Sequence, residues 1–176
     1  DIELAGDISV LTTALANIND TVVLSQRFDY PLKLVDKVKS YARKQKLEKV
    51  GNVGSWHAPY GVDLFMFHRH IWSTVQMPPF LIGRFRWDNW LVDHFLQSEV
   101  IIIEANDVLL PLYPTSREQL KSSNHYARFG AKYNDKLLKS REALFIGNVA
   151  HLPYRLSIMN SIQYVDNIST SSQNNS

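Results

Sequence analysis

Length, composition and charge narrow the possibilities before any motif is considered. The chain has 176 residues, 45% of them hydrophobic and 20% charged, which is the composition of an ordinary globular domain with a sizeable core. It has no cysteine, which excludes disulfides, zinc–thiolate sites and thiol nucleophiles within it. The net charge of +2 is too small to indicate a nucleic-acid partner, and no apolar run has the length needed to cross a bilayer.

The first residues read as the end of a strand. Asp1-Ile2-Glu3-Leu4 has this character, yet nothing precedes it in the chain. Because a natural domain rarely opens inside an element, we expect that an N-terminal portion of the domain is missing here.

Strand and helix patterns then alternate. Apolar residues at helical spacing predict a helix at about 7–17, and a β-branched run predicts a strand at 21–25 that leads into Arg27 and Asp29. A basic amphipathic helix is predicted at 32–47. Its charged face is interpreted either as a solvent-exposed surface or as a contact for a phosphate or a membrane.

An aromatic loop separates this helix from the next predicted strand. The loop spans 51–61 and includes His57 and Tyr60, and loops carry binding residues more often than regular elements do. A strand is predicted at 62–67. In the His68-Arg69-His70 segment that follows, the two histidines are expected to point to opposite faces, so a shared metal ion is not predicted.

The most informative segment is 78–91, with the sequence Pro-Pro-Phe-Leu-Ile-Gly-Arg-Phe-Arg-Trp-Asp-Asn-Trp-Leu. The two prolines hold their segment extended, and Gly83 permits a sharp bend. Helical spacing begins at Trp87 and predicts a helix to about residue 97, which places Asp88 in its first turn. The helix dipole favours an acid there, and a rigid element would project it into any cleft that the loop borders.

The remaining elements complete an α/β pattern. A uniformly apolar run at 99–104 predicts a strand covered on both faces, and a helix is predicted at about 135–144. Residues 1–160 are assigned to one domain and 161–176 to a disordered polar tail. The predicted fold is a layered α/β domain with a mixed, mainly parallel sheet flanked by helices.

In such sheets, ligands bind beyond the carboxyl ends of the strands. This rule selects a candidate rim, which consists of Asp1, Arg27, Asp29, the loop after Phe67 and the Asn106-Asp107 turn.

The segment 78–91 resembles the signature of a poorly characterised group of glycosyltransferase-like proteins with the nucleotide-diphospho-sugar transferase (GT-A) fold. The order of other segments is similar. Gln26-Arg27-Phe28-Asp29 resembles the Gln-Arg-Trp-Asp that ends a strand in the group, and 62–67 resembles its Asp-Tyr-Phe-Val-Phe strand. Asn124-His125-Tyr126 resembles its Asn-His-Asp-Tyr segment, and the likeness extends over roughly residues 1–157.

The resemblance implies transfer of a sugar from a nucleotide diphosphate donor to a carbohydrate or other hydroxyl acceptor, with Mn²⁺ or Mg²⁺ as cofactor. It makes Asp1 the surviving acid of the metal-binding motif and His125 the histidine that completes the metal shell. The carboxylate and phosphate oxygens involved suit a hard cation. A solvated terminal acid and a structural histidine remain the alternatives. Neither a nucleic-acid partner nor a membrane segment is implied.

The resemblance also places an acid near the acceptor, which makes Asp88 the candidate general base. The implied substrate-binding residues are Arg84, Trp87, Asn89, Trp90, Arg27 and Asp29. Trp87 and Trp90 would offer flat faces for sugar rings, and Arg84 and Arg86 would pair with diphosphate or a sugar acid. The alternative is an acid at the start of the helix, with tryptophans in the core and arginines on the surface.

The chain departs from the group near its third motif. Pro111-Leu112-Tyr113-Pro114 stands where a histidine is expected, and the acid between His125 and Tyr126 is missing. A non-catalytic carbohydrate-binding or scaffold fragment of the same fold therefore stays open. A phosphate or nucleic-acid binder that uses the basic helix at 32–47 is a third possibility, which the weak net charge disfavours.

Overall fold

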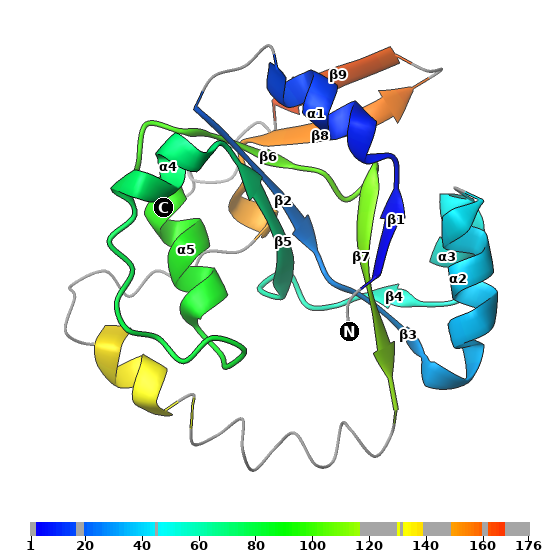
Figure 1. Ribbon diagram of the computed structural model, residues 1–176, viewed down its shortest axis with the longest axis horizontal. Coiled ribbons are helices and arrows are strands. Elements are labelled where there is room, and N and C mark those ends of the chain that lie inside the picture. Colours follow the sequence, from blue (N-terminus) through cyan, green and yellow to red (C-terminus); the bar gives the residue numbers. More distant parts are fainter. Residues whose placement is uncertain are drawn as a thin grey trace, which may run out of the picture.

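The computed structural model describes residues 3–16, 20–44, 46–116, 130, 132–138, 149–159 and 162–167. Two β-sheets lie side by side, with helices packed against both (Figure 1). The four-stranded sheet has the order β1 (Glu3–Gly6), β7 (Leu109–Thr115), β3 (Phe28–Pro31), β4 (Ser55–Trp56). The five-stranded sheet has the order β5 (Val62–Phe67), β2 (Thr21–Gln26), β6 (Ile101–Glu104), β8 (Tyr154–Met159), β9 (Ile162–Asn167).

The helices follow the same chain order. They are α1 (Ile8–Ala16), the short 3₁₀ helix η1 (Leu32–Leu34), α2 (Val35–Arg43), α3 (Leu47–Gly51), α4 (Arg69–Thr74), α5 (Trp87–Leu96) and the 3₁₀ helix η2 (Val149–His151). Residues 132–138 are also helical. None of the helices in the described residues combines the length and apolar character needed to cross a lipid bilayer.

Two segments of chain pass from one sheet into the other. β2 leads directly into β3 through Arg27, and β6 leads into β7 through the turn at residues 105–108. β2 pairs with β6, and β3 pairs with β7, both in parallel. The two crossing segments therefore run side by side, and the residues at the crossing are held by both sheets.

The sheets are mixed and not mainly parallel, which corrects the sequence prediction. The parallel pairings are β2–β6, β3–β7 and β6–β8, and all lie in the interior of a sheet. Each antiparallel pairing instead attaches an edge strand, namely β1, β4, β5 or β9. An apolar pattern predicts a strand but not its direction, because both directions bury the same face.

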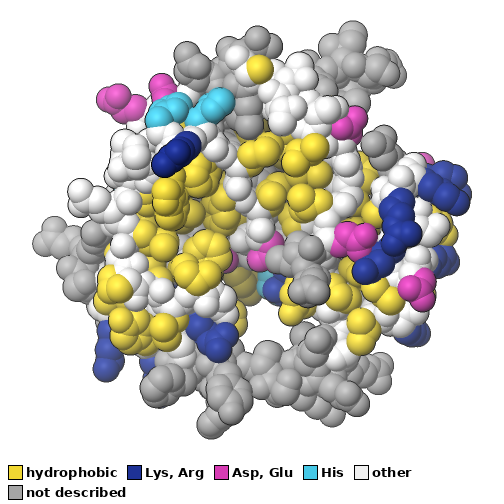
Figure 2. Space-filling view, in the orientation of Figure 1, with side chains coloured by type: hydrophobic (Ala, Val, Ile, Leu, Met, Phe, Trp, Pro, Cys, Tyr) yellow, Lys and Arg dark blue, Asp and Glu magenta, His cyan; other side chains and the backbone are white. Residues whose placement is uncertain are grey.

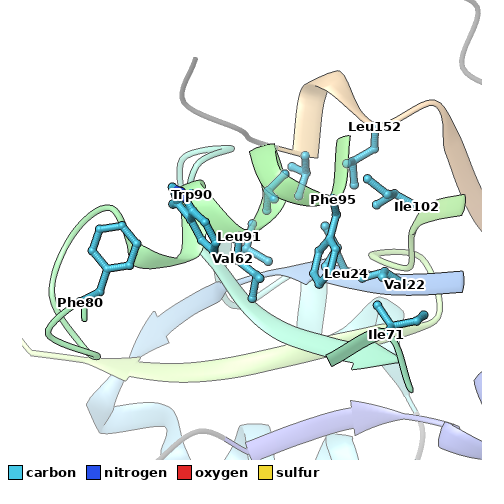
Figure 3. Close-up of a cluster of buried hydrophobic side chains, with 12 residues drawn as sticks. Val22, Leu24, Val62, Ile71, Phe80, Trp90, Leu91, Phe95, Ile102 and Leu152 are labelled. Carbon is cyan, nitrogen blue, oxygen red and sulfur yellow. The ribbon is translucent and has the colours of Figure 1, made fainter. Parts of the chain in front are cut away.

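The five-stranded sheet is covered on both faces. Val22 and Leu24 of β2 pack on one face against Leu91 and Phe95 of α5 (Figure 3). Val23 faces the opposite side, where α1 packs. Every residue of β2 is buried, as expected for a strand between two layers. Each such aliphatic side chain stabilises the fold by about 1.5–3 kcal/mol relative to exposure, so this strand is a rigid base for the residues at its end.

The four-stranded sheet has its own core. Val38 of α2 and Val50 of α3 pack against Phe28 and Tyr30 of β3. Much of the helix predicted at 32–47 is helical in α2, but the structure divides the segment into η1, α2 and the start of α3. β3 begins directly after Arg27 and contains Asp29, two of the predicted rim residues. A separate cluster of apolar side chains thus supports this strand.

Three other sequence predictions need correction. β7 was not predicted, because Pro111 and Pro114 are unusual in a central strand, although four of its residues, 109–112, are buried. The rings of His68 and His70 stack, with 5.7 Å between their centroids, instead of pointing to opposite faces. The reason is that the chain turns into α4 directly after His68. β9 lies within the predicted disordered tail, where a run of β-forming residues pairs antiparallel with β8.

Candidate functional site

Polar side chains converge where the chain crosses between the two sheets. Arg27 lies between β2 and β3, Asp29 lies in β3, His57 follows β4, Asp63 lies in β5 and Asp88 lies in the first turn of α5. We call these five residues the polar cluster. Strands and a helix anchored in two apolar cores fix all five, so their mutual positions are set by the fold.

Arg27 is the centre of the polar cluster. Its Nε lies 3.0 Å from Oδ1 of Asp29 and 3.9 Å from Oδ2 of Asp63. Its guanidinium carbon lies 4.6 Å from the centroid of the Tyr113 ring, in the range of a cation–π contact. The side chains of Arg27, Asp29 and Asp63 are between 20% and 24% exposed, so water screens these charges only partly.

His57 is paired to the same centre. Its Nδ1 lies 2.7 Å from Oδ2 of Asp29 and 2.8 Å from Nη2 of Arg27. Burial alone would raise the pKa of Asp29, but the hydrogen bond with His57 and the charge of Arg27 hold it below its ordinary value. Asp29 is therefore the carboxylate that stays ionised, and it orients the guanidinium of Arg27 and the imidazole of His57.

The other two acids behave in the opposite way. Burial raises the pKa of Asp63, although the charge of Arg27 opposes the change. Burial also raises the pKa of Asp88 to about 6, and the nearby charge of Asp63 adds to the effect. Hydrogen bonds with the backbone N–H groups of Asn89, Asp88 and Val62 oppose it. Asp88 is therefore ionised at neutral pH, yet it binds a proton more tightly than an ordinary aspartate.

Asn89 ties α5 to the loop that carries His57. Its side chain is buried, and Nδ2 donates to the carbonyl oxygen of Tyr60 at 2.7 Å. Gly61 ends this loop, and a Cβ there would lie 2.3 Å from Cδ2 of His57. Only glycine leaves room for the imidazole at this point, so Asn89 and Gly61 together fix the distance between the helix and the loop.

A second buried network lies beneath the loop. Oδ1 of Asn106 accepts hydrogen bonds from the backbone N–H of Gln26 at 2.8 Å and from Oγ of Ser25 at 3.0 Å. Nε2 of Gln26 donates to the carbonyl oxygen of His57. Nδ2 of Asn106 donates to Glu104, whose other oxygen lies 2.8 Å from Nε of Arg155. The network joins the two crossing segments to the backbone of His57.

The structure brings some of the sequence-predicted residues together and separates others. Arg27 and Asp29 form an ion pair, and Asp88 lies close enough to Asp63, which Arg27 also faces, to feel its charge. Asn89 lies next to Asp88 but is occupied by the contact with Tyr60. Arg84 is exposed, and its Nη1 donates to the carbonyl oxygen of Gly83 at 3.0 Å.

The two tryptophans predicted to stack on sugars pack against other side chains. Trp90 is only 7% exposed and contacts Phe80 (Figure 3). It also stacks on the ring of His94. Trp87 is half-buried, with its ring 5.8 Å from that of Phe65. These contacts favour the alternative of core tryptophans. The exposed aromatic ring beside the polar cluster is instead that of Tyr60, which meets the edge of His57.

Sequence reasoning missed two residues of the site. Asp63 is the one acid in an otherwise apolar strand pattern at 62–67, and this isolated charge was the available signal. Tyr113 lies in β7, which the sequence does not predict as a strand because of Pro111 and Pro114. His57 was noted only as a loop residue, since its partner Asp29 lies 28 residues away and the loop geometry that joins them is not local.

The predicted metal ligands, Asp1 and His125, lie outside the described residues. Within the part of the chain that the structure describes, no group of three His, Cys, Asp or Glu side chains is arranged to hold a metal ion. Asp29 in particular is already paired with Arg27 and His57.

Acidic side chains and the hydrophobic surface around them are visible near the middle of the face in Figure 2. A hollow of about 300 Å³ lies elsewhere, on α2, and is lined by Asp36, Lys39, Ser40, Arg43 and Lys44. It contains no residue of the polar cluster. No family model, curated protein or solved structure matches the chain. The function is therefore inferred from the polar cluster and from the sequence likeness of the segment that carries Asp88.

Proposed function

We propose that the polar cluster is the acceptor side of a sugar-transfer site and that Asp88 is its general base. In the proposed reaction, a hydroxyl oxygen of the acceptor attacks the anomeric carbon of a nucleotide diphosphate sugar. The bond between that carbon and the diphosphate oxygen breaks, and the nucleotide diphosphate leaves with the electron pair. Asp88 takes the proton of the attacking hydroxyl.

The observation that carries the proposal is the raised pKa of Asp88 in a fixed position beside Asp63. With a pKa of about 6, Asp88 is roughly nine-tenths ionised at pH 7 and still a stronger base than a solvated aspartate. Its backbone hydrogen bonds hold the carboxylate in place. The resemblance of residues 78–91 to glycosyltransferase-like proteins supports the choice of sugar transfer over other reactions that need a base.

The remaining residues have supporting roles. Asp63 accepts hydrogen bonds from neighbouring hydroxyls of the acceptor and keeps the pKa of Asp88 high through its charge. Arg27 contacts both Asp29 and Asp63, and His57 contacts Asp29, so these contacts restrain the two acids. Tyr60, which is 52% exposed, offers an aromatic face to a sugar ring in the place first expected of Trp90.

The divalent cation belongs to the proposal through Asp1 and His125 alone. A bound Mn²⁺ or Mg²⁺ would stabilise negative charge on the departing diphosphate. Within the described residues, no group of three His, Cys, Asp or Glu side chains is arranged to hold such an ion.

Asp88→Asn tests the proposal. We expect the wild-type protein to release nucleotide diphosphate from at least one of a panel of nucleotide sugars with Mn²⁺ present, and the variant to lose at least 100-fold in kcat with little change in nucleotide-sugar binding. Asp93→Asn is the matched control, because Asp93 lies on the same helix, is buried and also has a raised pKa. Full activity in Asp88→Asn, or neither turnover nor calorimetric binding in the wild type, refutes the proposal.

A second candidate is a non-catalytic carbohydrate-binding domain. The observation in its favour is that Asp29 is already paired with both Arg27 and His57, as expected of a static recognition surface. This function predicts binding of a glycan without any turnover in the wild type, and no catalytic effect of Asp88→Asn. Glycan binding by calorimetry together with a nucleotide-release assay separates the two candidates.

A further inference from the structure

The loop before α5 exposes large apolar side chains. Leu81 is 42% exposed, Ile82 is 58% exposed and Phe85 is 56% exposed. Single exposed hydrophobic residues are common on protein surfaces and need no explanation. Here three of them fall within five consecutive positions of one loop, which we call the apolar tip.

The apolar tip is held firmly by the rest of the protein. Asn134 is fully buried, and its Oδ1 accepts a hydrogen bond from the N–H of Leu81 at 2.9 Å. Its Nδ2 donates to the carbonyl oxygens of Leu81 at 3.2 Å and of Phe85 at 2.8 Å. One buried side chain thus fixes both ends of the loop. The side chains are exposed because the loop presents them, and not because its backbone is loose.

The shape of the apolar tip is that of a projection. Gly83 adopts a φ of +75°, and nothing lies within 4 Å of the position that a Cβ would take there. The exposed side chains of a turn that borders open space are free to enter a soft apolar layer.

Basic side chains surround the apolar tip. Arg84 is exposed within it, and Lys132 and Lys136 are exposed on the helical segment 132–138 that carries Asn134. Arg86 is paired with Asp135, with its Nε 2.9 Å from Oδ1. Figure 2 shows hydrophobic and basic side chains near one another at the lower left of this face. Long cationic side chains beside exposed apolar groups match the anionic headgroups above a hydrocarbon layer.

We propose that the apolar tip docks this protein on the surface of a bilayer that contains anionic lipids. Leu81, Ile82 and Phe85 enter the boundary between headgroups and acyl chains, while Arg84 stays at the level of the lipid phosphates. The proposal does not depend on sugar transfer. It assigns a peripheral contact to this loop.

The absence of cysteine makes a direct test possible. In Ile82→Cys, the new thiol is labelled with an environment-sensitive fluorophore and mixed with vesicles of phosphatidylcholine and phosphatidylserine at about 70:30. We expect a several-fold rise in emission and a blue shift with these vesicles, and a much smaller change with pure phosphatidylcholine. The same label at Ile8→Cys, on α1, is the control, since Ile8 is 52% exposed. No change at Ile82→Cys, or equal changes at both labels, overturns the proposal.

Unlabelled variants test the same contact by vesicle sedimentation. We expect Ile82→Ser combined with Phe85→Ser to lower the partition coefficient at least ten-fold, and Arg84→Gln to lower it several-fold on anionic vesicles only. Ile8→Ser combined with Leu32→Ser removes two equally exposed apolar residues elsewhere and is expected to bind as the wild type does. Equal losses in both double variants contradict the proposal. The proposal is also contradicted if the wild-type protein self-associates without binding vesicles and the tip variant no longer self-associates.

Discussion

At the scale of single residues, Asp88 combines two properties that oppose each other. Its position in the first turn of α5 and its backbone hydrogen bonds favour the ionised form, whereas burial and the charge of Asp63 disfavour it more strongly. The result is a carboxyl group whose pKa is about 6. Natural proteins retain such costly groups where chemistry requires them, which is a reason to connect Asp88 with function.

The raised pKa has a consequence for stability. The folded state binds the proton of Asp88 more tightly than the unfolded state, so ionisation of Asp88 costs stability as pH rises from 3.8 to about 6 and above. We expect Asp88→Asn to raise the free energy of unfolding at pH 8 by on the order of 1–3 kcal/mol. At pH 4 the difference should largely vanish. Urea denaturation at both pH values measures it, and a pH-independent difference contradicts the assignment.

Gly61 provides a prediction about the position of His57. A methyl group at Gly61 would overlap the imidazole, whereas nothing lies within 4 Å of the corresponding position at Gly51. We expect Gly61→Ala to displace His57 and lower turnover at least ten-fold, with Gly51→Ala close to the wild type. Parallel assays of turnover and urea denaturation distinguish loss of function from loss of fold. Unchanged turnover in Gly61→Ala, with its fold intact, shows that the position of His57 is unimportant.

At the scale of elements, the site depends on how two strand pairs cross between the sheets. β2 with β3 and β6 with β7 run side by side, and Asn106 joins them through Gln26 and Ser25 at the crossing. Parallel pairing leaves the carboxyl ends of β2 and β6 together, which places Arg27 beside this network. Helix α5 packs on one face of the five-stranded sheet and adds Asp88 to the site from that side.

Asn106 therefore carries a prediction at this scale. It is 8% exposed and bonded to several buried groups, so Asn106→Ala leaves donors and acceptors without partners. We expect the free energy of unfolding to fall by about 2–4 kcal/mol. Asp107→Ala, at the exposed neighbouring position of the same turn, should change it by less than about 0.5 kcal/mol. Similar effects of the two substitutions indicate that the network adds little.

At the scale of the whole molecule, local patterns predicted the elements better than their assembly. Helices α1 and α5 are predicted from their helical spacing, and strands β2 and β5 from their local strand-type sequence, because each of these signals lies within the element itself. β7 is not predicted, because Pro111 and Pro114 are unusual in a central strand. The antiparallel direction of the edge strands was not predictable, since it depends on pairing between distant segments.

The same difference applies to the site. Asp88, Arg27 and Asp29 stand out from local motifs, and the structure pairs Arg27 with Asp29 and links Asp88 to them through Asp63. Asp63 and Tyr113 join them only through the pairing of β5 with β2 and of β7 with β3, which no short pattern records. Whether Trp90 faces a ligand or the core is likewise left open by the sequence, because a sequence pattern does not show whether an aromatic face is covered by neighbours such as Phe80.

The most direct test of Asp88 as the base is the pH dependence of kcat/KM for nucleotide-sugar turnover. With a base of pKa about 6, the rate should fall tenfold per pH unit below that value and level off above it. In Asp88→Asn, any residual turnover should lack this acidic limb. A wild-type profile without an inflection between about pH 5 and 7, or the same inflection in Asp88→Asn, would contradict the assignment.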